Sequence, residues 1–144
     1  METEKIEGVV AVPYQYRHDR LCFLLLHQIK PRCWELPKGG RDGKDIKQAM
    51  IDELLEEANI QRSMPRPLMY KGKQYTYTYS FDGKSGNRIE RLMYVFYVKV
   101  GRSEEIRVND VEHDYFEWFG YKKASSHLRH QSMRRALTIT ERLI

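Results

Sequence analysis

Four acidic residues fall within six positions in the segment 52–57, which reads DELLEE, and the sequence LPKGG precedes it at residues 36–40. On a helix, residues three and four positions apart are neighbours, so Glu53, Glu56 and Glu57 share one side. These carboxylates repel one another unless a hard divalent cation such as Mg²⁺ or Mn²⁺ binds their oxygens and leaves positions open for phosphate. The segment therefore predicts a metal-binding helix, and the alternative is an acidic helix face in solvent.

Residues 36–60, LPKGGRDGKDIKQAMIDELLEEANI, resemble the Nudix box. The core of that pattern is Gly, five residues, Glu, seven residues, and Arg-Glu-apolar-any-Glu-Glu-any-Gly-apolar. Gly39 opens the box here, and Glu53, Glu56 and Glu57 fill its three acidic places. The resemblance covers nearly the whole chain and implies an α/β (α+β) fold, the Nudix α/β/α sandwich with a mixed sheet, one catalytic helix and a C-terminal helix.

The segment departs from the family pattern in three ways. Asp52 stands where the family has Arg, Asn59 stands in place of Gly, and the stretch after Gly39 is one residue short. The early Glu of the pattern consequently falls on Lys44 when counted from the helix, or on Asp45 when counted from Gly39. Asn is the next best residue after Gly for the left-handed turn that ends a helix. The family's Arg helps to hold the catalytic acids, so Asp52 predicts weaker activity, tighter metal dependence, or a module that binds without turnover.

Size and composition indicate one globular domain spanning residues 1–144. The chain has 144 residues, 41% of them hydrophobic and 31% charged, which is enough to bury a sizeable core. No apolar run approaches the roughly 20 residues of a membrane span, and residues 1–4 are acidic, unlike a signal peptide. We therefore expect a cytoplasmic protein with no membrane association and no obligate protein partner. Cys22 and Cys33 are expected to be free thiols.

Hydrophobic periodicity predicts strands around one well-marked helix. The helix is expected to begin at Asp45 as N-cap, with Gln48 completing a capping box. The first two strands should pair, and the alternating aromatic segment 75–81 should form a hairpin with the strand that follows it. The predicted strands cover 6–12, 21–28, 75–81, 89–100 and 115–120, and the predicted helices cover 45–58 and 131–144.

The net charge of +5 is informative because the proposed metal site is itself acidic. Positive charge must be concentrated elsewhere, in the segments 62–73, 84–91 and 122–135. Such a surface predicts a polyanionic partner. The alternative for any individual Lys or Arg is that it only keeps the surface soluble.

Several short motifs outside the box are similar to the branch that hydrolyses dinucleoside polyphosphates such as diadenosine tetraphosphate. They are Trp34 before LPKG, EIRV at 105–108, EHDY at 112–115, WFG at 118–120 and MRRAL at 133–137. This resemblance implies a small nucleotide polyphosphate substrate that is split into ATP and AMP. RNA 5′-pyrophosphohydrolases of the decapping type share the 34–40 and 48–50 segments, so an RNA 5′ end is an alternative partner. A diphosphoinositol polyphosphate hydrolase and a nucleotide- or RNA-binding module stay open as well.

The resemblance also implies roles for individual residues. Glu53, Glu56 and Glu57 would hold Mg²⁺ or Mn²⁺ with a backbone carbonyl from the Lys38–Gly39 turn, and Glu112 would be the general base or a further ligand, with Glu56 the second choice as base. Phosphate charge would be met by cationic side chains, and a nucleobase would stack on tyrosines. For the tyrosines of 75–81, core packing is the alternative. The candidates for substrate binding are Lys38, Lys73, Tyr77, Tyr79, Arg88, Arg91 and Tyr115.

Overall fold

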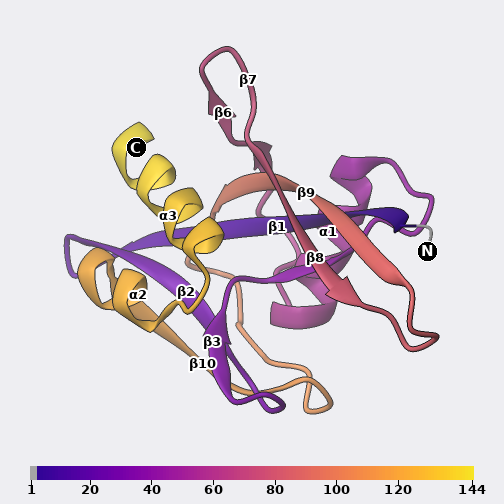
Figure 1. Ribbon diagram of the computed structural model, residues 1–144. Helices are drawn as coiled ribbons and strands as arrows, with labels where there is room; N and C mark the ends of the chain where they lie inside the picture. Colours follow the sequence, from indigo (N-terminus) through magenta and orange to yellow (C-terminus); the bar gives the residue numbers. More distant parts are fainter. Residues whose placement is uncertain (1–2) are drawn as a thin grey trace.

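A mixed sheet lies between helices on both of its faces, in a computed structural model that describes residues 3–144 (Figure 1). The path through the sheet is β10-β2-β1-β9-β5, with β3 beside β2, β4 beside β1 and β8 beside β9, and β6 and β7 form a separate hairpin. The strands are β1 (Thr3–Arg17), β2 (Arg20–Gln28), β3 (Cys33–Glu35), β4 (Lys38–Gly40), β5 (Arg66–Pro67), β6 (Met69–Tyr70), β7 (Lys73–Gln74), β8 (Thr76–Asp82), β9 (Arg88–Lys99) and β10 (His113–Gly120), and the helices are α1 (Ile46–Ala58), α2 (Tyr121–His127) and α3 (Gln131–Leu143).

Strand β1 is the centre of the molecule. It runs parallel to β9 from Thr3 to Tyr14 and antiparallel to β2 and β4. Both of its faces are covered, which explains why its sequence reads as a nearly continuous apolar run. Val9 packs on the side of α1, whereas Val10 packs on the side of α2 and α3. The predicted α/β/α sandwich is therefore confirmed.

Helix α1 begins and ends with the residues that the sequence indicates. The Asp45 side chain accepts from the backbone N–H of Gln48, and Asn59 adopts the left-handed conformation at φ 59° and ψ 32°. One half of the predicted capping box is wrong, because the Gln48 side chain donates to Asp52 Oδ1 at 2.9 Å instead of turning back to the N-cap.

The predicted strands and the C-terminal helix are confirmed, including the β1–β2 pairing and the β8–β9 hairpin. Helix α2 and the short strands β3 to β7 were not predicted. The C-terminal helix ends at Leu143, one residue before the predicted end, and Ile144 is 37% exposed. Cys22 and Cys33 are free, as predicted.

Within residues 3–144, none of the helices combines the length and the apolar character needed to cross a membrane. Of the acidic segment 1–4 considered above, Met1 and Glu2 lie outside the described residues.

Candidate functional site

Glu57 lies at the contact between α1 and β4. Only 5% of this residue is exposed, and its Oε1 accepts from the backbone N–H of Lys38 at 2.9 Å. Burial is the main cause that raises the pKa of Glu57 to about 9, and the charges of Glu35, Glu53 and Glu112 add to the effect although the Lys38 N–H opposes it. A carboxyl in this environment stays protonated at neutral pH unless a cation stabilises its ionised form.

Glu53 occupies the space beside Gly39. A Cβ atom built on Gly39 would lie 2.0 Å from the Glu53 carboxyl carbon, so no side chain fits at position 39 while Glu53 keeps its place. Burial, followed by the charges of Glu56 and Glu112, raises the pKa of Glu53 to about 7. The glycine of the box thus lets this carboxylate approach the backbone of β4.

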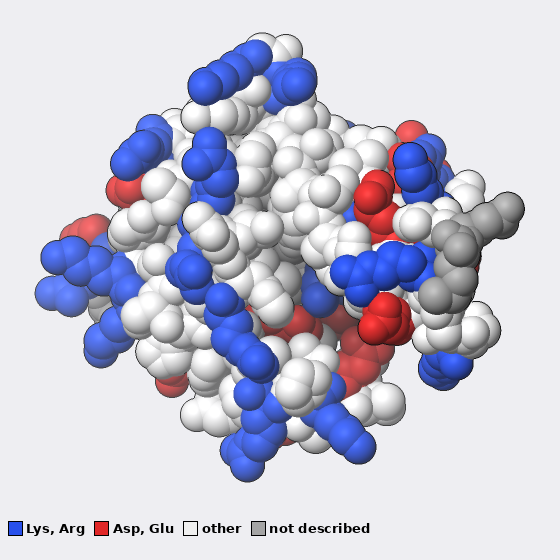
Figure 2. Space-filling view, viewed as in Figure 1, with Lys and Arg blue, Asp and Glu red and all other residues white. Residues whose placement is uncertain are grey.

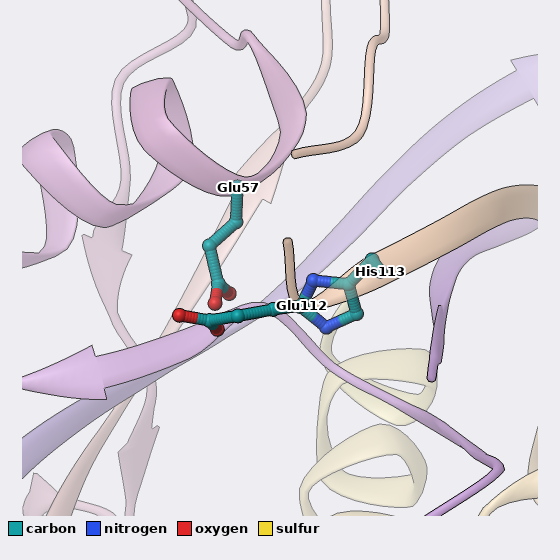
Figure 3. Close-up of side chains that lie close together, drawn as sticks. All are labelled: Glu57, Glu112 and His113. Carbon is teal, nitrogen blue, oxygen red and sulfur yellow. The ribbon is translucent and has the colours of Figure 1, made fainter. Parts of the chain in front are cut away.

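Glu112 and His113 approach Glu57 from the start of β10 (Figure 3). One ligand atom from each of these three side chains lies within 4.8 Å of the others. His113 is fully buried, and its Nε2 lies 2.8 Å from Oε2 of Glu35, which is itself buried.

The structure therefore brings Glu53, Glu57 and Glu112 to one place, while Glu56 is exposed at its margin and acts on Glu53 through its charge. The oxygens and the imidazole nitrogen gathered here suit a divalent metal ion. Glu35 and His113 were not predicted as members of this site. The available signal was the EH pair at 112–113 and the acid between Trp34 and the LPKGG segment.

Asp52 does not add an unmatched negative charge. Its Oδ2 lies 2.9 Å from Lys44 Nζ, and Lys44 is the position on which the early Glu of the family pattern falls when counted from the helix. The hydrogen bond from Lys44, followed by that from Gln48, holds the pKa of Asp52 below its usual value. Lys44 and Asp52, two departures from the family pattern, thus form one ion pair. Each has the opposite charge to the residue that the family has at its position.

Three of the predicted substrate-binding residues line one cavity. Lys38, Tyr77 and Tyr79 enclose about 250 Å³ together with residues from the start of α3 and its preceding loop. Lys38 Nζ lies 5.8 Å from the centre of the Tyr79 ring and 3.6 Å from Glu35 Oε1, so it stands between the cavity and the acidic site. Tyr77 and Tyr79 also pack against the core, as the alternative interpretation of these rings expects, and binding of a nucleobase by them stays a prediction.

The remaining predicted substrate-binding residues lie elsewhere. Arg91 donates to the Tyr79 hydroxyl at 3.3 Å and lines a separate hollow of about 800 Å³ near the start of β1. Arg88 pairs with Asp82 at 3.0 Å on the hairpin end, and Lys73 is exposed in β7. Tyr115, 51% exposed, packs beside Trp34 at 5.5 Å between ring centroids.

Basic side chains spread over the face that carries α3 and the β6–β7 hairpin, and acidic side chains lie in a recess below them (Figure 2). In the sequence, no Asp or Glu occurs between residues 58 and 81 or between 118 and 140. These two acid-free segments meet in space, since Arg135 lies 5.6 Å from the centre of the Tyr70 ring. Positive potential therefore borders the acidic site on this side.

A sandwich of this kind, in which Glu57 of α1 is buried against a Pro-Lys-Gly turn and Glu53 is half-buried beside it, is typical of a pyrophosphohydrolase. The chain belongs to the Nudix family, because the family model described as NUDIX domain matches residues 5–139.

Solved structures of similar fold include other members of the family. A C. elegans Ap4A hydrolase binary complex is 22% identical, with 96% of each chain covered and a TM-score of 0.71. A NUDIX hydrolase of Listeria monocytogenes is 22% identical, with 94% of this chain and 92% of that chain covered and a TM-score of 0.74. The NUDIX domain of Shewanella oneidensis NrtR, complexed with ADP ribose, is 14% identical, with 97% and 89% covered and a TM-score of 0.74. These identities support the fold alone, and no curated protein sequence matches the chain.

Proposed function

We propose that this enzyme hydrolyses a diphosphate linkage in a nucleotide polyphosphate, with diadenosine tetraphosphate as the preferred substrate and ATP and AMP as products. The observation that carries the proposal is the position of Lys38. Its backbone N–H binds Glu57, whereas its ammonium group faces a cavity lined by Tyr77 and Tyr79. Phosphates at the acidic site and a base in the cavity would therefore belong to one ligand.

The acidic site fits a divalent cation, because ligand atoms of Glu57, Glu112 and His113 lie within 4.8 Å of one another and burial raises the pKa values of Glu53 and Glu57. Glu53, Glu56, Glu57 and Glu112, with a backbone carbonyl of the Lys38–Gly39 turn, would hold Mg²⁺ or Mn²⁺. The cation would withdraw charge from phosphate oxygens and lower the pKa of a bound water. Glu112 would bind the cation through one carboxylate oxygen, and we assign to its other oxygen the removal of the proton from the attacking water, because this residue lies at the exposed side of the site.

The other residues bind and orient the substrate. The Lys38 ammonium would neutralise phosphate charge between the acidic site and the cavity. Tyr77 and Tyr79 offer ring faces for a base, and stacking of this kind contributes roughly 1–3 kcal/mol per base. Arg91 would hold the Tyr79 ring through its hydroxyl. Lys73, Arg88 and Tyr115 do not line this cavity and have no part in the proposed mechanism.

The proposal is tested by chromatography of products after incubation with Mg²⁺ and one of three substrates. These are diadenosine tetraphosphate, a 5′-triphosphorylated RNA and a diphosphoinositol polyphosphate. We expect ATP and AMP from the first, and loss of this activity in Glu57→Gln with retention in Glu117→Gln, a control at an exposed position of β10. Rapid turnover of another substrate without turnover of the first would overturn the choice of substrate. No turnover of any would favour a binding module.

A second candidate substrate is the 5′ end of an RNA strand, and the two acid-free segments favour it. An RNA bound along α3 and the β6–β7 hairpin would release counterions from its phosphates, so its affinity would fall steeply with salt. The test compares the binding affinities of an RNA and of a mononucleotide at increasing salt concentrations. Equal affinity for both ligands, with equal salt dependence, would exclude this candidate.

A further inference from the structure

His113 carries a nitrogen that the fold leaves without a partner. The residue is fully buried, and its Nδ1 has no hydrogen-bond partner among the described residues 3–144. A buried polar atom without a partner costs the free energy of its lost hydration, and such atoms are rare in folded proteins. A group from outside the protein, such as a metal ion, would satisfy this nitrogen.

The surroundings of His113 identify the kind of ligand. The side chains of Glu57, Glu112 and His113 lie close together, with one ligand atom of each within 4.8 Å of the others (Figure 3). Since Nε2 lies 2.8 Å from Glu35 Oε2, the nitrogen left for a ligand is Nδ1. Proteins commonly hold a metal-ligating histidine in this way, with the second ring nitrogen donating to a carboxylate.

We propose that His113 is a metal ligand through Nδ1, beside the carboxylates of Glu57 and Glu112. Glu35 is then the positioning residue that fixes the tautomer and the orientation of the imidazole ring. This inference rests on the proposed function, which requires a divalent cation at the site. Imidazole suits transition metals whereas carboxylate and water suit Mg²⁺, so the site should prefer Mn²⁺ or Co²⁺ over Mg²⁺.

Pulsed electron paramagnetic resonance of the full chain loaded with Mn²⁺ tests the inference directly. We expect the bound Mn²⁺ to show hyperfine coupling to ¹⁴N, which carboxylate and water ligands do not produce. Bound Mn²⁺ without nitrogen coupling would overturn the assignment of His113 and would leave the proposed hydrolysis intact. Absence of any Mn²⁺ binding would overturn both. This measurement uses the wild-type protein and does not depend on the folding of a variant.

Two variants and one control extend the test. His113→Gln should remove the nitrogen coupling and weaken Mn²⁺ binding by about tenfold or more, with a smaller loss for Mg²⁺. Glu35→Gln should keep the coupling and weaken binding, because the ligand remains but its orientation is less fixed. His18→Gln, at an exposed position of the β1–β2 turn, should change neither quantity. If His113→Gln retained the coupling, the nitrogen would come from another residue and the inference would be wrong.

Discussion

Glu53 and Glu57 are residues whose ionised forms the folded chain disfavours. Their pKa values are raised from 4.5 to about 7 and about 9, chiefly by burial. The folded state keeps these protons at a pH at which the unfolded state has lost them. For the metal-free protein, the contribution of these two groups to the free energy of unfolding therefore falls as pH rises, between about pH 5 and pH 7 for Glu53 and up to about pH 9 for Glu57.

Urea unfolding with a chelator present checks this prediction at pH 6 and pH 8. Replacement of Glu57 by Gln removes the buried ionisable group, so the loss of stability between the two pH values should be smaller in this variant. Saturating Mg²⁺ should reduce the same loss in the wild type, because a cation favours the ionised carboxylates. Glu117→Gln, at an exposed position, should behave as the wild type. An unchanged pH dependence in Glu57→Gln would contradict the prediction.

The ion pair between Lys44 and Asp52 explains how the chain tolerates an acid at position 52. Asp52→Arg alone would place two cations opposite each other and loosen the segment that leads into α1. We expect this variant, and Lys44→Glu alone, to lose several-fold in kcat/KM. The double variant Lys44→Glu with Asp52→Arg recreates the charges of the family pattern and should recover activity to within about twofold.

Steady-state kinetics of the four proteins measures the coupling between the two positions. Little change in thermal stability is expected, because exposed ion pairs contribute little to folding. Additive losses in the double variant would show that the pair does not position the site.

At the residue scale, the sequence indicated Gly39, Glu53 and Glu57 because all three belong to one local pattern. Glu35 and His113 could not be placed in the same way, since their contact joins positions far apart in the chain. They meet because β2 pairs with β3 on one side and with β10 on the other. A pairing of that kind depends on the whole sheet, so the local EH pair at 112–113 did not by itself indicate the contact with Glu35.

At the scale of elements, the end of α1 is fixed by one unusual backbone conformation. Asn59 lies at φ 59°, its N–H bonds the carbonyl of Leu55 at 3.1 Å, and its side chain donates to the Glu105 carbonyl at 2.8 Å. Asn59→Ala should lower the free energy of unfolding by about 1–2 kcal/mol, because alanine is strained in the left-handed region. Asn59→Gly should lose less, since glycine adopts this region freely although it lacks the side-chain bond.

Chemical denaturation of both variants separates the two effects. Equal losses for Ala and Gly would mean that the side-chain hydrogen bond, rather than the backbone conformation, determines the stability of this helix end.

The elements that the sequence predicted correctly carry their own periodicity or caps, as α1, β8 and α3 do. Strands β3 to β7 are two or three residues long, too short for an alternation to be recognised. Helix α2 packs only Ala124 fully into the core, so its sequence has no clear apolar stripe. Such elements form because neighbouring elements supply hydrogen bonds and shield them from solvent. Which elements are neighbours is determined only when the whole sheet assembles.

At the scale of the whole molecule, the two cores lie on opposite faces of the same strand, β1. We propose that residues 1–144 act as one domain, because neither core can form without this strand. Calorimetry should then show a single unfolding transition with equal calorimetric and van't Hoff enthalpies. Two separate transitions would show that the faces fold independently.

We propose that the carboxylates of Glu53, Glu57 and Glu112 form the metal centre of this pyrophosphohydrolase. Anomalous diffraction from crystals soaked with Mn²⁺ tests it most directly. We predict a strong anomalous peak between Glu57 and Glu112, close to the Lys38–Gly39 turn. A map without density at this position, with Mn²⁺ bound elsewhere on the molecule, would show that these carboxylates do not form the metal centre.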